Sequence, residues 1–254
     1  MKLKSQLSAT IFFLAVSLVP ASASIVTYSG EDIMATTTSA HPVSTAAAAS
    51  FATAVAGLGT TSLVTFEGAT LGSFSNLTIA PGVTMNGTDI NSANQTIRNT
   101  SNSPSFPTLD GYNTTPSGSY FVEVQAGTLT FTFASGVDAF GAYFSGVQFF
   151  DPNESITFSD GTSETISIPE TNTSGSVGAL DFVGFTDAGK SITSITINAG
   201  NAQIGADYIG VDDVQFTTVP TVTGVPEPSS IALALSASLG LALVLVRRQR
   251  AQNN

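Results

Sequence analysis

Hydrophobic and polar residues alternate along much of the chain from residue 62 onward. The segment GTLTFTFA (127–134) is the clearest case. Successive side chains of a strand point to opposite faces, so this segment places three apolar residues on one face and two threonines on the other. These are Leu129, Phe131 and Phe133 against Thr130 and Thr132. The segment ESITFSDGTSETISI (154–168) holds two such runs around Asp160 and Gly161, a dipeptide favoured in tight turns, and predicts a hairpin.

Further strands follow from the same pattern. They are predicted at residues 25–28, 63–66, 120–125, 139–144, 181–185, 191–197 and 208–216. Short strands separated by Gly, Asn, Ser and Asp predict a mainly β fold, an antiparallel β-sandwich over residues 62–219. We favour a jelly roll, because the long loop predicted at 86–118 suits crossing connections better than a simple meander. The 17 phenylalanines, mostly at inward positions, are expected to fill its core.

One stretch before these strands has the period of a helix. Within residues 39–60, Phe51, Val55 and Leu58 recur at i, i+4 and i+7. Ser44 or Thr45 is expected to cap its N-terminus, and glycines at 57 and 59 to end it. Residues 24–61 are therefore predicted to form a strand followed by an Ala-rich helix. A disordered Ala/Ser/Thr linker is the alternative.

The N-terminus has the three parts of a secretory signal peptide. Lys2 and Lys4 provide the positive start, residues 11–19 the apolar stretch, and Ala21-Ser22-Ala23 a small-residue cleavage site. We expect signal peptidase to remove residues 1–23 by cutting between Ala23 and Ser24.

The C-terminus carries an uncharged apolar run from Ile231 to Val246, which we expect to form a transmembrane helix, followed by Arg247, Arg248 and Arg250. A helix of that length spans about 24 Å, against a hydrocarbon core of about 30 Å, so it is short for a permanent anchor. Positive residues stay on the cytoplasmic side, which would leave the β domain outside and residues 247–254 inside.

The apolar run is preceded by Val225-Pro226-Glu227-Pro228-Ser229, within a linker at 220–230. A Pro-Glu-Pro motif, an apolar helix and a basic end, in that order, resemble the PEP-CTERM sorting signal of Gram-negative bacteria. The resemblance implies cleavage near the motif by an exosortase, after an inner-membrane intermediate, and delivery to the cell surface or extracellular matrix. A single-pass anchor that is never cut is the alternative. Segments within 62–217, such as YIGVDDVQF, more weakly resemble the sandwich domains that precede such tails, which supports the fold.

Charge excludes one class of partner. Without both ends, two basic residues, Arg98 and Lys190, face seventeen acidic ones, a net charge of −15 over residues 24–226. A surface this acidic repels phosphate backbones, so nucleic-acid binding is excluded. Cysteine is absent, which excludes disulfides and thiol chemistry.

Candidate catalytic chemistry is sparse. His41 is the single histidine, and it precedes the β domain, where we expect it to be a solvated turn residue before Pro42. A Ser-His-Asp arrangement would need this one residue to dock into a distant site. Pairs of carboxylates suited to hydrolysis can be named in many ways, and no spacing singles one out. We therefore predict a protein that is not an enzyme.

Three carboxylates form a candidate calcium site. Glu67 ends the strand LVTFEG, and Asp212 and Asp213 lie within YIGVDDVQF. The first and last strands of a jelly roll are commonly neighbours, which would bring these acids to one edge. Calcium takes six to eight oxygen ligands, and we expect it here as a structural ion. Because side chains alternate, only one of the two aspartates should point inward, and we favour Asp213. A solvated acidic pair is the alternative.

Three functions are compatible with these features. The first is a non-catalytic surface or matrix protein. The second is a carbohydrate-binding module of the exopolysaccharide layer, although such sites usually rely on exposed Trp or Tyr, and the chain has no Trp and five Tyr. Tyr112 and Tyr120, in or beside the long loop, are the candidates there. An extracellular hydrolase comes third.

Overall fold

The computed structural model describes residues 25–100, 110–148, 155–159, 163–169, 178–187, 192–201 and 205–218, together with Ser236. The predicted signal peptide, the Pro-Glu-Pro motif, the apolar run 231–246 and the basic end lie outside these residues. Within the described ranges, no helix has both the length and the apolar character needed to cross a membrane.

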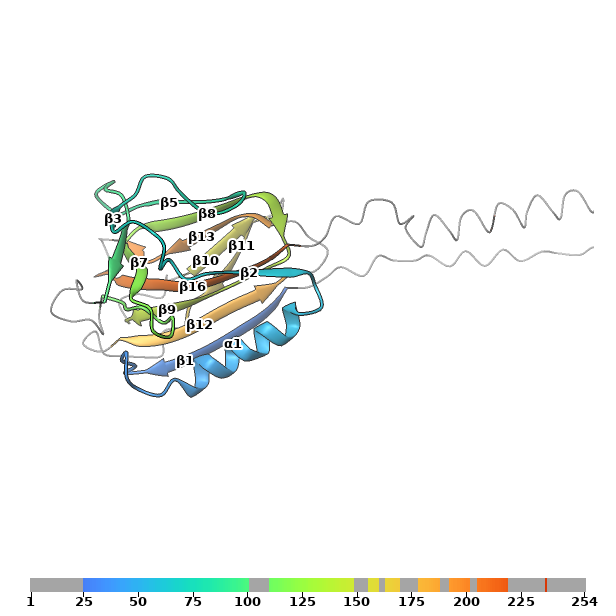
Figure 1. The fold of residues 1–254 in the computed structure, drawn as a ribbon, viewed down its shortest axis with the longest axis horizontal. Coiled ribbons are helices and arrows are strands. Elements are labelled where there is room, and N and C mark those ends of the chain that lie inside the picture. The colour runs from blue at the N-terminus through green and yellow to red at the C-terminus, as the bar shows by residue number, and fades with distance from the viewer. Residues whose placement is uncertain are drawn as a thin grey trace, which may run out of the picture. The chain divides into compact units, whose positions relative to one another are not determined.

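Two antiparallel sheets make up the fold (Figure 1). The first sheet runs, in spatial order, through β1 (Val26–Ile33), β12 (Ala179–Thr186), β9 (Ala139–Val147), β16 (Tyr208–Thr218), β7 (Tyr120–Gln125), β6 (Thr96–Asn99) and β3 (Gly72–Ser73), with β2 (Thr60–Val64) also paired to β16. The second sheet runs through β11 (Ser163–Ser167), β10 (Ser155–Ser159), β13 (Ile192–Asn198), β8 (Thr128–Val137), β5 (Val83–Thr88) and β4 (Leu77–Ala80). A small ribbon pairs β14 (Gly200–Asn201) with β15 (Gly205–Ala206). The prediction of a mainly β, antiparallel fold is confirmed.

Aromatic contacts join the two sheets across one core. Phe131 on β8 lies 5.6 Å from Phe140 on β9, and Phe133 lies 5.4 Å from Phe216 on β16, measured between ring centroids. Every phenylalanine whose side-chain exposure the structure describes is buried, as the alternation predicts. Each such burial contributes about 1.5–3 kcal/mol, so the core holds this cysteine-free chain together by packing.

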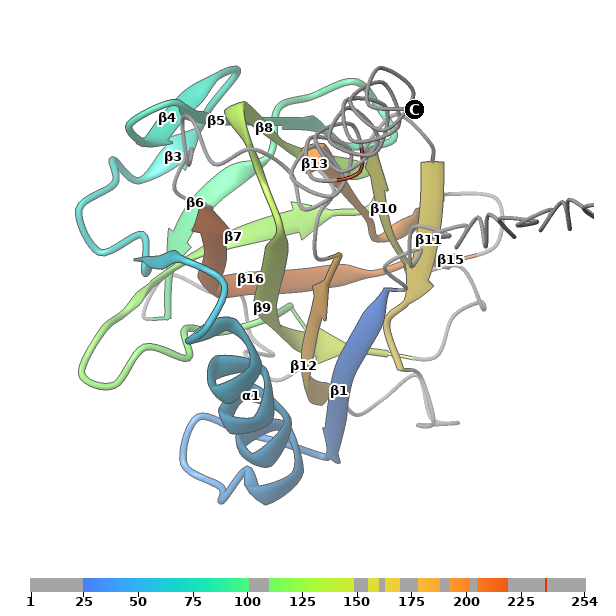
Figure 2. The same ribbon diagram turned by 90° about the vertical axis from the view of Figure 1, so that its right-hand side faces the viewer.

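The helix α1 (Pro42–Val55) covers the outer face of the first sheet, beside β1 and β12 (Figure 2). Phe51 packs 5.6 Å from Phe182 on β12. Glycine at 141 and 184 leaves room for this ring, since a Cβ at Gly184 would lie 2.8 Å from Phe51. The predicted helix is confirmed, and the linker alternative is wrong.

The predicted helix cap is wrong. His41 occupies the N-cap position and makes no side-chain cap hydrogen bond. The cap comes from β1, where Asp32 Oδ2 accepts hydrogen bonds from the Ser44 backbone N–H at 2.8 Å and from its hydroxyl at 2.7 Å. Asp32 Oδ1 also accepts the Val43 N–H at 3.1 Å. A cap supplied from a neighbouring strand leaves no local sequence signal.

Most predicted strands are present, with ends that shift by a few residues. The hairpin prediction is confirmed by β10 and β11, which pair antiparallel from Ser155↔Ser167 to Ser159↔Ser163. The loop predicted at 86–118 is wrong in part, because β5 extends to Thr88 and β6 spans Thr96–Asn99. The strands β3, β4 and β6 were not predicted, because each has two to four residues, too few for an alternating pattern to be recognised.

Candidate functional site

Asp212 and Asp213 lie where β16 departs from regular pairing. The register between β16 and β9 shifts between Asp212 and Gln215, and Asp213 has a φ of 48°. A β-bulge of this kind re-aims side chains, so strict alternation fails locally. Both aspartates are buried, with exposed fractions of 1% for Asp212 and 9% for Asp213. The prediction that only one of the two would point inward is therefore wrong: Asp213 is buried as expected, and so is Asp212.

Both carboxylates hold the same turn. Asp212 Oδ2 accepts the backbone N–H groups of Thr114 at 2.8 Å and of Thr115 at 3.2 Å. Asp213 accepts the Thr115 hydroxyl on Oδ1 at 2.7 Å and the Thr114 hydroxyl on Oδ2 at 3.0 Å. Two adjacent acids of a core strand thus fasten residues 113–115 to the first sheet.

Glu67 joins the same arrangement through Asn113. Its Oε1 accepts the backbone N–H groups of Ser119 at 2.7 Å and Tyr120 at 2.8 Å, and the Asn113 side-chain amide at 2.9 Å. The same Asn113 nitrogen lies 3.0 Å from Asp212 Oδ2. The three predicted residues therefore meet at one place, the segment 113–120, which sequence reasoning did not connect to them.

Burial makes the Asp212 carboxyl group a weaker acid than an ordinary aspartate. Burial, and secondly the charge of Asp213, raise its pKa to about 7, against the lowering effect of hydrogen bonds from Thr114 and Thr115. Its Oδ1 atom is buried without a hydrogen-bond partner. A buried carboxylate oxygen without a partner is costly when charged, so Asp212 takes up a proton near neutral pH.

The geometry bears on the calcium prediction. Among the described residues, no three His, Cys, Asp or Glu side chains are grouped so that they hold a metal ion. Asp212 Oδ2 and both carboxylate oxygens of Asp213 accept hydrogen bonds from N–H and O–H donors, whereas calcium needs six to eight oxygen ligands around it. As arranged, the three acids position a loop. Calcium binding by Glu67, Asp212 and Asp213 stays a prediction.

The other candidate residues have structural contacts. Tyr112 is only 1% exposed; its N–H donates to Ser145 Oγ at 2.8 Å, and Ser145 Oγ donates to its carbonyl at 2.7 Å. Tyr112 is therefore excluded as a sugar platform, while Tyr120 is half-buried. His41 is half-buried, with Nε2 2.8 Å from the Thr36 carbonyl oxygen, beside the first turn of α1.

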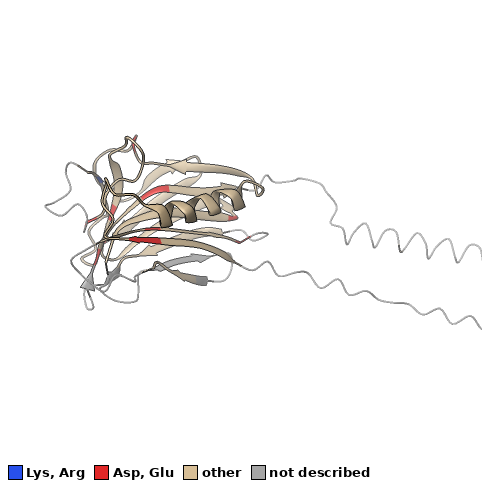
Figure 3. Cartoon of the chain, turned by 90° about the horizontal axis from the view of Figure 1, so that it is seen from below, with Lys and Arg blue, Asp and Glu red and all other residues tan. Residues whose placement is uncertain are grey.

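A further buried charge, Glu123, was not anticipated from the sequence. Glu123 on β7, 1% exposed, forms an ion pair with Arg98 on β6 and accepts a hydrogen bond from Gln125. Burial raises the pKa of Glu123, and Gln125 and Arg98 oppose that rise. Arg98 is the one basic residue in the part of the chain that the structure describes (Figure 3). The pair joins neighbouring strands, and partner removal would leave an uncompensated buried charge.

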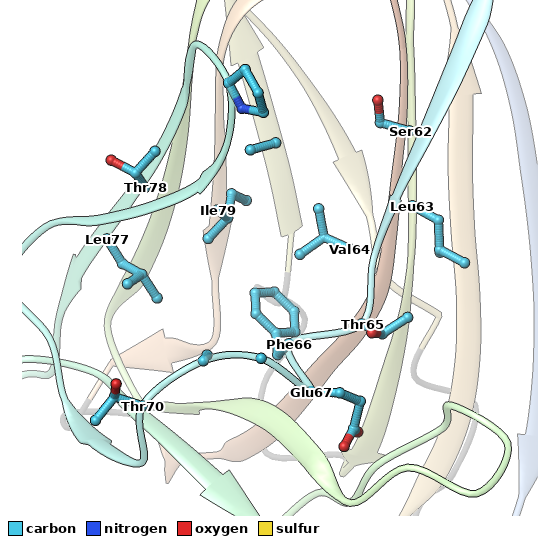
Figure 4. Close-up of a pocket in the computed structure, with 14 residues that line it drawn as sticks. Ser62, Leu63, Val64, Thr65, Phe66, Glu67, Thr70, Leu77, Thr78 and Ile79 are labelled. Carbon is cyan, nitrogen blue, oxygen red and sulfur yellow. The ribbon is translucent and has the colours of Figure 1, made fainter.

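A groove of about 650 Å³ opens between β2 and β4 (Figure 4). It is lined by residues 62–70 and 77–81. Val64, Phe66 and Ile79 extend into it, and Leu63 points away on the other side of β2. Glu67 is the only charged lining residue, and its Oε1 already accepts three hydrogen bonds. The groove therefore offers aliphatic and hydroxyl contacts and no free cationic group.

Comparisons with protein families, with curated proteins and with solved structures found no match to this chain. The functional proposals therefore depend on the residues of the chain itself.

Proposed function

We propose that the protein is an exported surface or extracellular-matrix protein, sorted through its C-terminal tail and carrying a non-catalytic β-sandwich. The observation that carries this proposal is the order of three features at the C-terminus. Val225-Pro226-Glu227-Pro228-Ser229 precedes the apolar run Ile231 to Val246, which precedes three arginines. This order resembles the PEP-CTERM signal, and together with the signal peptide it makes exosortase and signal peptidase the partners during export.

The end of the folded domain is compatible with cleavage at the motif. The last strand, β16, ends at Thr218, and the last core residue is Phe216. Residues 219–225 separate this strand from Pro226. A cut near the motif would therefore remove no residue of the described core, so the released domain would keep its packing.

A jelly roll is the topology we propose for the sandwich. Eight strands in chain order, β7 to β13 and then β16, support it through their pairing. The first pairs with the last (β7 with β16), the second with the seventh (β8 with β13), the third with the sixth (β9 with β12), and the fourth with the fifth (β10 with β11). Nested pairing of this kind is what a long hairpin acquires when it rolls into two Greek keys.

The non-catalytic role is supported by how the candidate groups are used. Carboxylate oxygens of Asp212, Asp213 and Glu67 accept hydrogen bonds from the segment 113–120. His41 Nε2 lies 2.8 Å from the Thr36 carbonyl oxygen and 3.0 Å from the Ser39 hydroxyl, in the turn before α1. The Ser39 hydroxyl itself donates to the Thr36 carbonyl oxygen at 3.1 Å, whereas a serine nucleophile donates its proton to the general base that activates it.

The intact mass of the protein from its native host, compared between membrane and matrix fractions, tests the proposal. We expect a matrix form that begins at Ser24 and ends near Glu227, and a variant with Pro226→Ala and Pro228→Ala that keeps the tail and stays in the membrane. A matched variant, Pro220→Ala, should be processed normally. A full-length tail confined to the membrane in the unaltered protein would overturn the sorting proposal.

A further inference from the structure

The outer face of the second sheet carries hydroxyl and amide residues in three rows. Strand register aligns them across β5, β8 and β13, and the first row continues to Thr78 on β4. The first row is Thr78, Thr84, Thr132 and Ser194. The second row is Asn86, Thr130 and Thr196. The third row is Thr88, Thr128 and Asn198. We call these positions the hydroxyl face.

The hydroxyl face is the outer surface of the sheet. On β8 its threonines alternate with Leu129, Phe131 and Phe133, which are buried in the core. Thr132 is exposed, and Thr130 is half-buried, with its hydroxyl 2.9 Å from that of Thr196 on β13. The rows therefore turn toward solvent while their neighbours along each strand fill the interior.

No position of the hydroxyl face carries a charged residue. The formal net charge of residues 24–226 is −15, and none of that charge comes from this face. Neighbouring strands lie about 4.8 Å apart, and successive same-face residues on one strand about 6.7 Å apart. The result is a regular lattice of groups that both donate and accept hydrogen bonds.

We propose that the hydroxyl face binds a neutral polysaccharide. This inference names the partner of the matrix protein proposed above and rests on that proposal. Protein interfaces are enriched in aromatic residues, Met and Arg, none of which occurs in the three rows. Lipid surfaces need apolar or basic side chains, and nucleic acids need basic ones. An anionic polysaccharide is repelled by the charge of the domain.

A neutral glycan matches what the face presents. Its hydroxyls donate and accept as Thr, Ser and Asn do, and its C–H surfaces pack against threonine methyl groups. β-Branched side chains are stiff at χ1, so these hydroxyls are ordered in advance and lose little entropy on binding. Repetition along the rows lets an extended chain gain from many weak contacts at once.

Affinity gel electrophoresis of the exported protein, purified from its host, tests the proposal. The neutral probes are hydroxyethyl cellulose, mixed-linkage β-glucan and dextran, and alginate is the anionic probe. We expect at least one neutral glycan to retard the protein and alginate to have no effect. The double variant Thr130→Val with Thr196→Val keeps the shape of both side chains and removes two hydroxyls, and should weaken that retardation about tenfold.

Thr27→Val, an exposed strand position on β1 of the first sheet, is the matched control and should bind like the unaltered protein. Thr132→Arg, which places a long charged side chain on the face, should abolish binding even if the double variant folds poorly. Retardation by no neutral glycan, by alginate alone, or equally in all variants would overturn the proposal. Intact mass and fractionation of the same variants report tail sorting separately, so failure of glycan binding is distinguishable from failure of the sorting proposal.

Discussion

Asp32 and Ser44 are joined by two hydrogen bonds, from the backbone N–H of Ser44 at 2.8 Å and from its hydroxyl at 2.7 Å. They lie twelve residues apart, one on a strand and one in the first turn of α1. The negative carboxylate meets the N-terminal end of the helix, where free N–H groups and the helix dipole favour an anion. This contact fixes where α1 begins and how it lies against β1.

Ser44→Ala should lower the free energy of unfolding by about 1–3 kcal/mol, because it removes the buried hydrogen bond from the Ser44 hydroxyl to the charged Asp32 carboxylate and keeps the backbone N–H bond. Ser50→Ala on the same helix is the matched control, because the Ser50 hydroxyl is exposed and bonds only to the Ala46 carbonyl. Urea unfolding of both variants checks this. Equal losses for the two would mean that the Asp32 contact contributes nothing.

The same contact makes stability sensitive to acid. Burial acts to raise the pKa of Asp32, but hydrogen bonds from Ser44 and Val43 and the nearby His41 outweigh it, so the pKa lies below its ordinary value. A lowered pKa gives stability that is present above the unfolded-state pKa, about 3.9, and is lost as pH falls through the folded-state value. Asp32→Asn should therefore differ most from the unaltered protein at neutral pH and least near pH 2. A constant difference across this range would contradict the assignment.

Asp212 should change the pH dependence of stability in the opposite direction to Asp32. Its pKa of about 7 lies above the unfolded-state value, so its contribution is fully favourable below about pH 4 and is lost as pH rises toward 7. Asp212→Asn should lose less stability than the unaltered protein between pH 4 and 8, measured by urea unfolding. Parallel profiles for Asp212→Asn and the unaltered protein would refute the raised pKa.

Calcium offers a direct test of the sequence-based metal site. If Glu67, Asp212 and Asp213 bind the ion, added calcium raises the melting temperature in proportion to the logarithm of its concentration above the dissociation constant. Asp213→Asn should then remove the rise, while Asp89→Asn keeps it. Equal melting temperatures in calcium and in chelator would show that the calcium site is absent. The three acids would then serve only to position the segment 113–120.

Gly111 should be the most sensitive glycine near this loop. It has a φ of 84°, and a Cβ there would lie 2.2 Å from the Gly210 backbone nitrogen on β16. Gly111→Ala should destabilise by about 2–5 kcal/mol, combining backbone strain with overpacking. Gly57→Ala, where a Cβ meets nothing within 4 Å, should be neutral or slightly stabilising. Thermal unfolding compares the two, and a tolerated Gly111→Ala would mean that the segment moves away from β16 at little cost.

Alternation was enough to predict the long strands, since residues such as Phe131 and Thr132 must face opposite ways wherever the strand lies. The expectation that the first and last strands of a jelly roll are neighbours placed Glu67 near Asp212 and Asp213, and β2 does pair with β16. Neither pattern predicted which groups connect the three acids, because Asn113 and Thr114 lie in a segment without any periodic pattern. The β-bulge at Asp213 breaks the alternation on which the inward-facing choice depended. The rows of the hydroxyl face depend on register between strands distant in sequence, which no single segment encodes.

β16 is also the last strand of the domain to leave the ribosome, although three strands, β7, β9 and β2, pair with it. Its partner Thr60 precedes Thr218 by 158 residues. Strands this far apart in sequence pair slowly, because the entropy of closing the long loop is lost before the contacts that offset it have formed. The first sheet therefore stays incomplete until residue 218 is available.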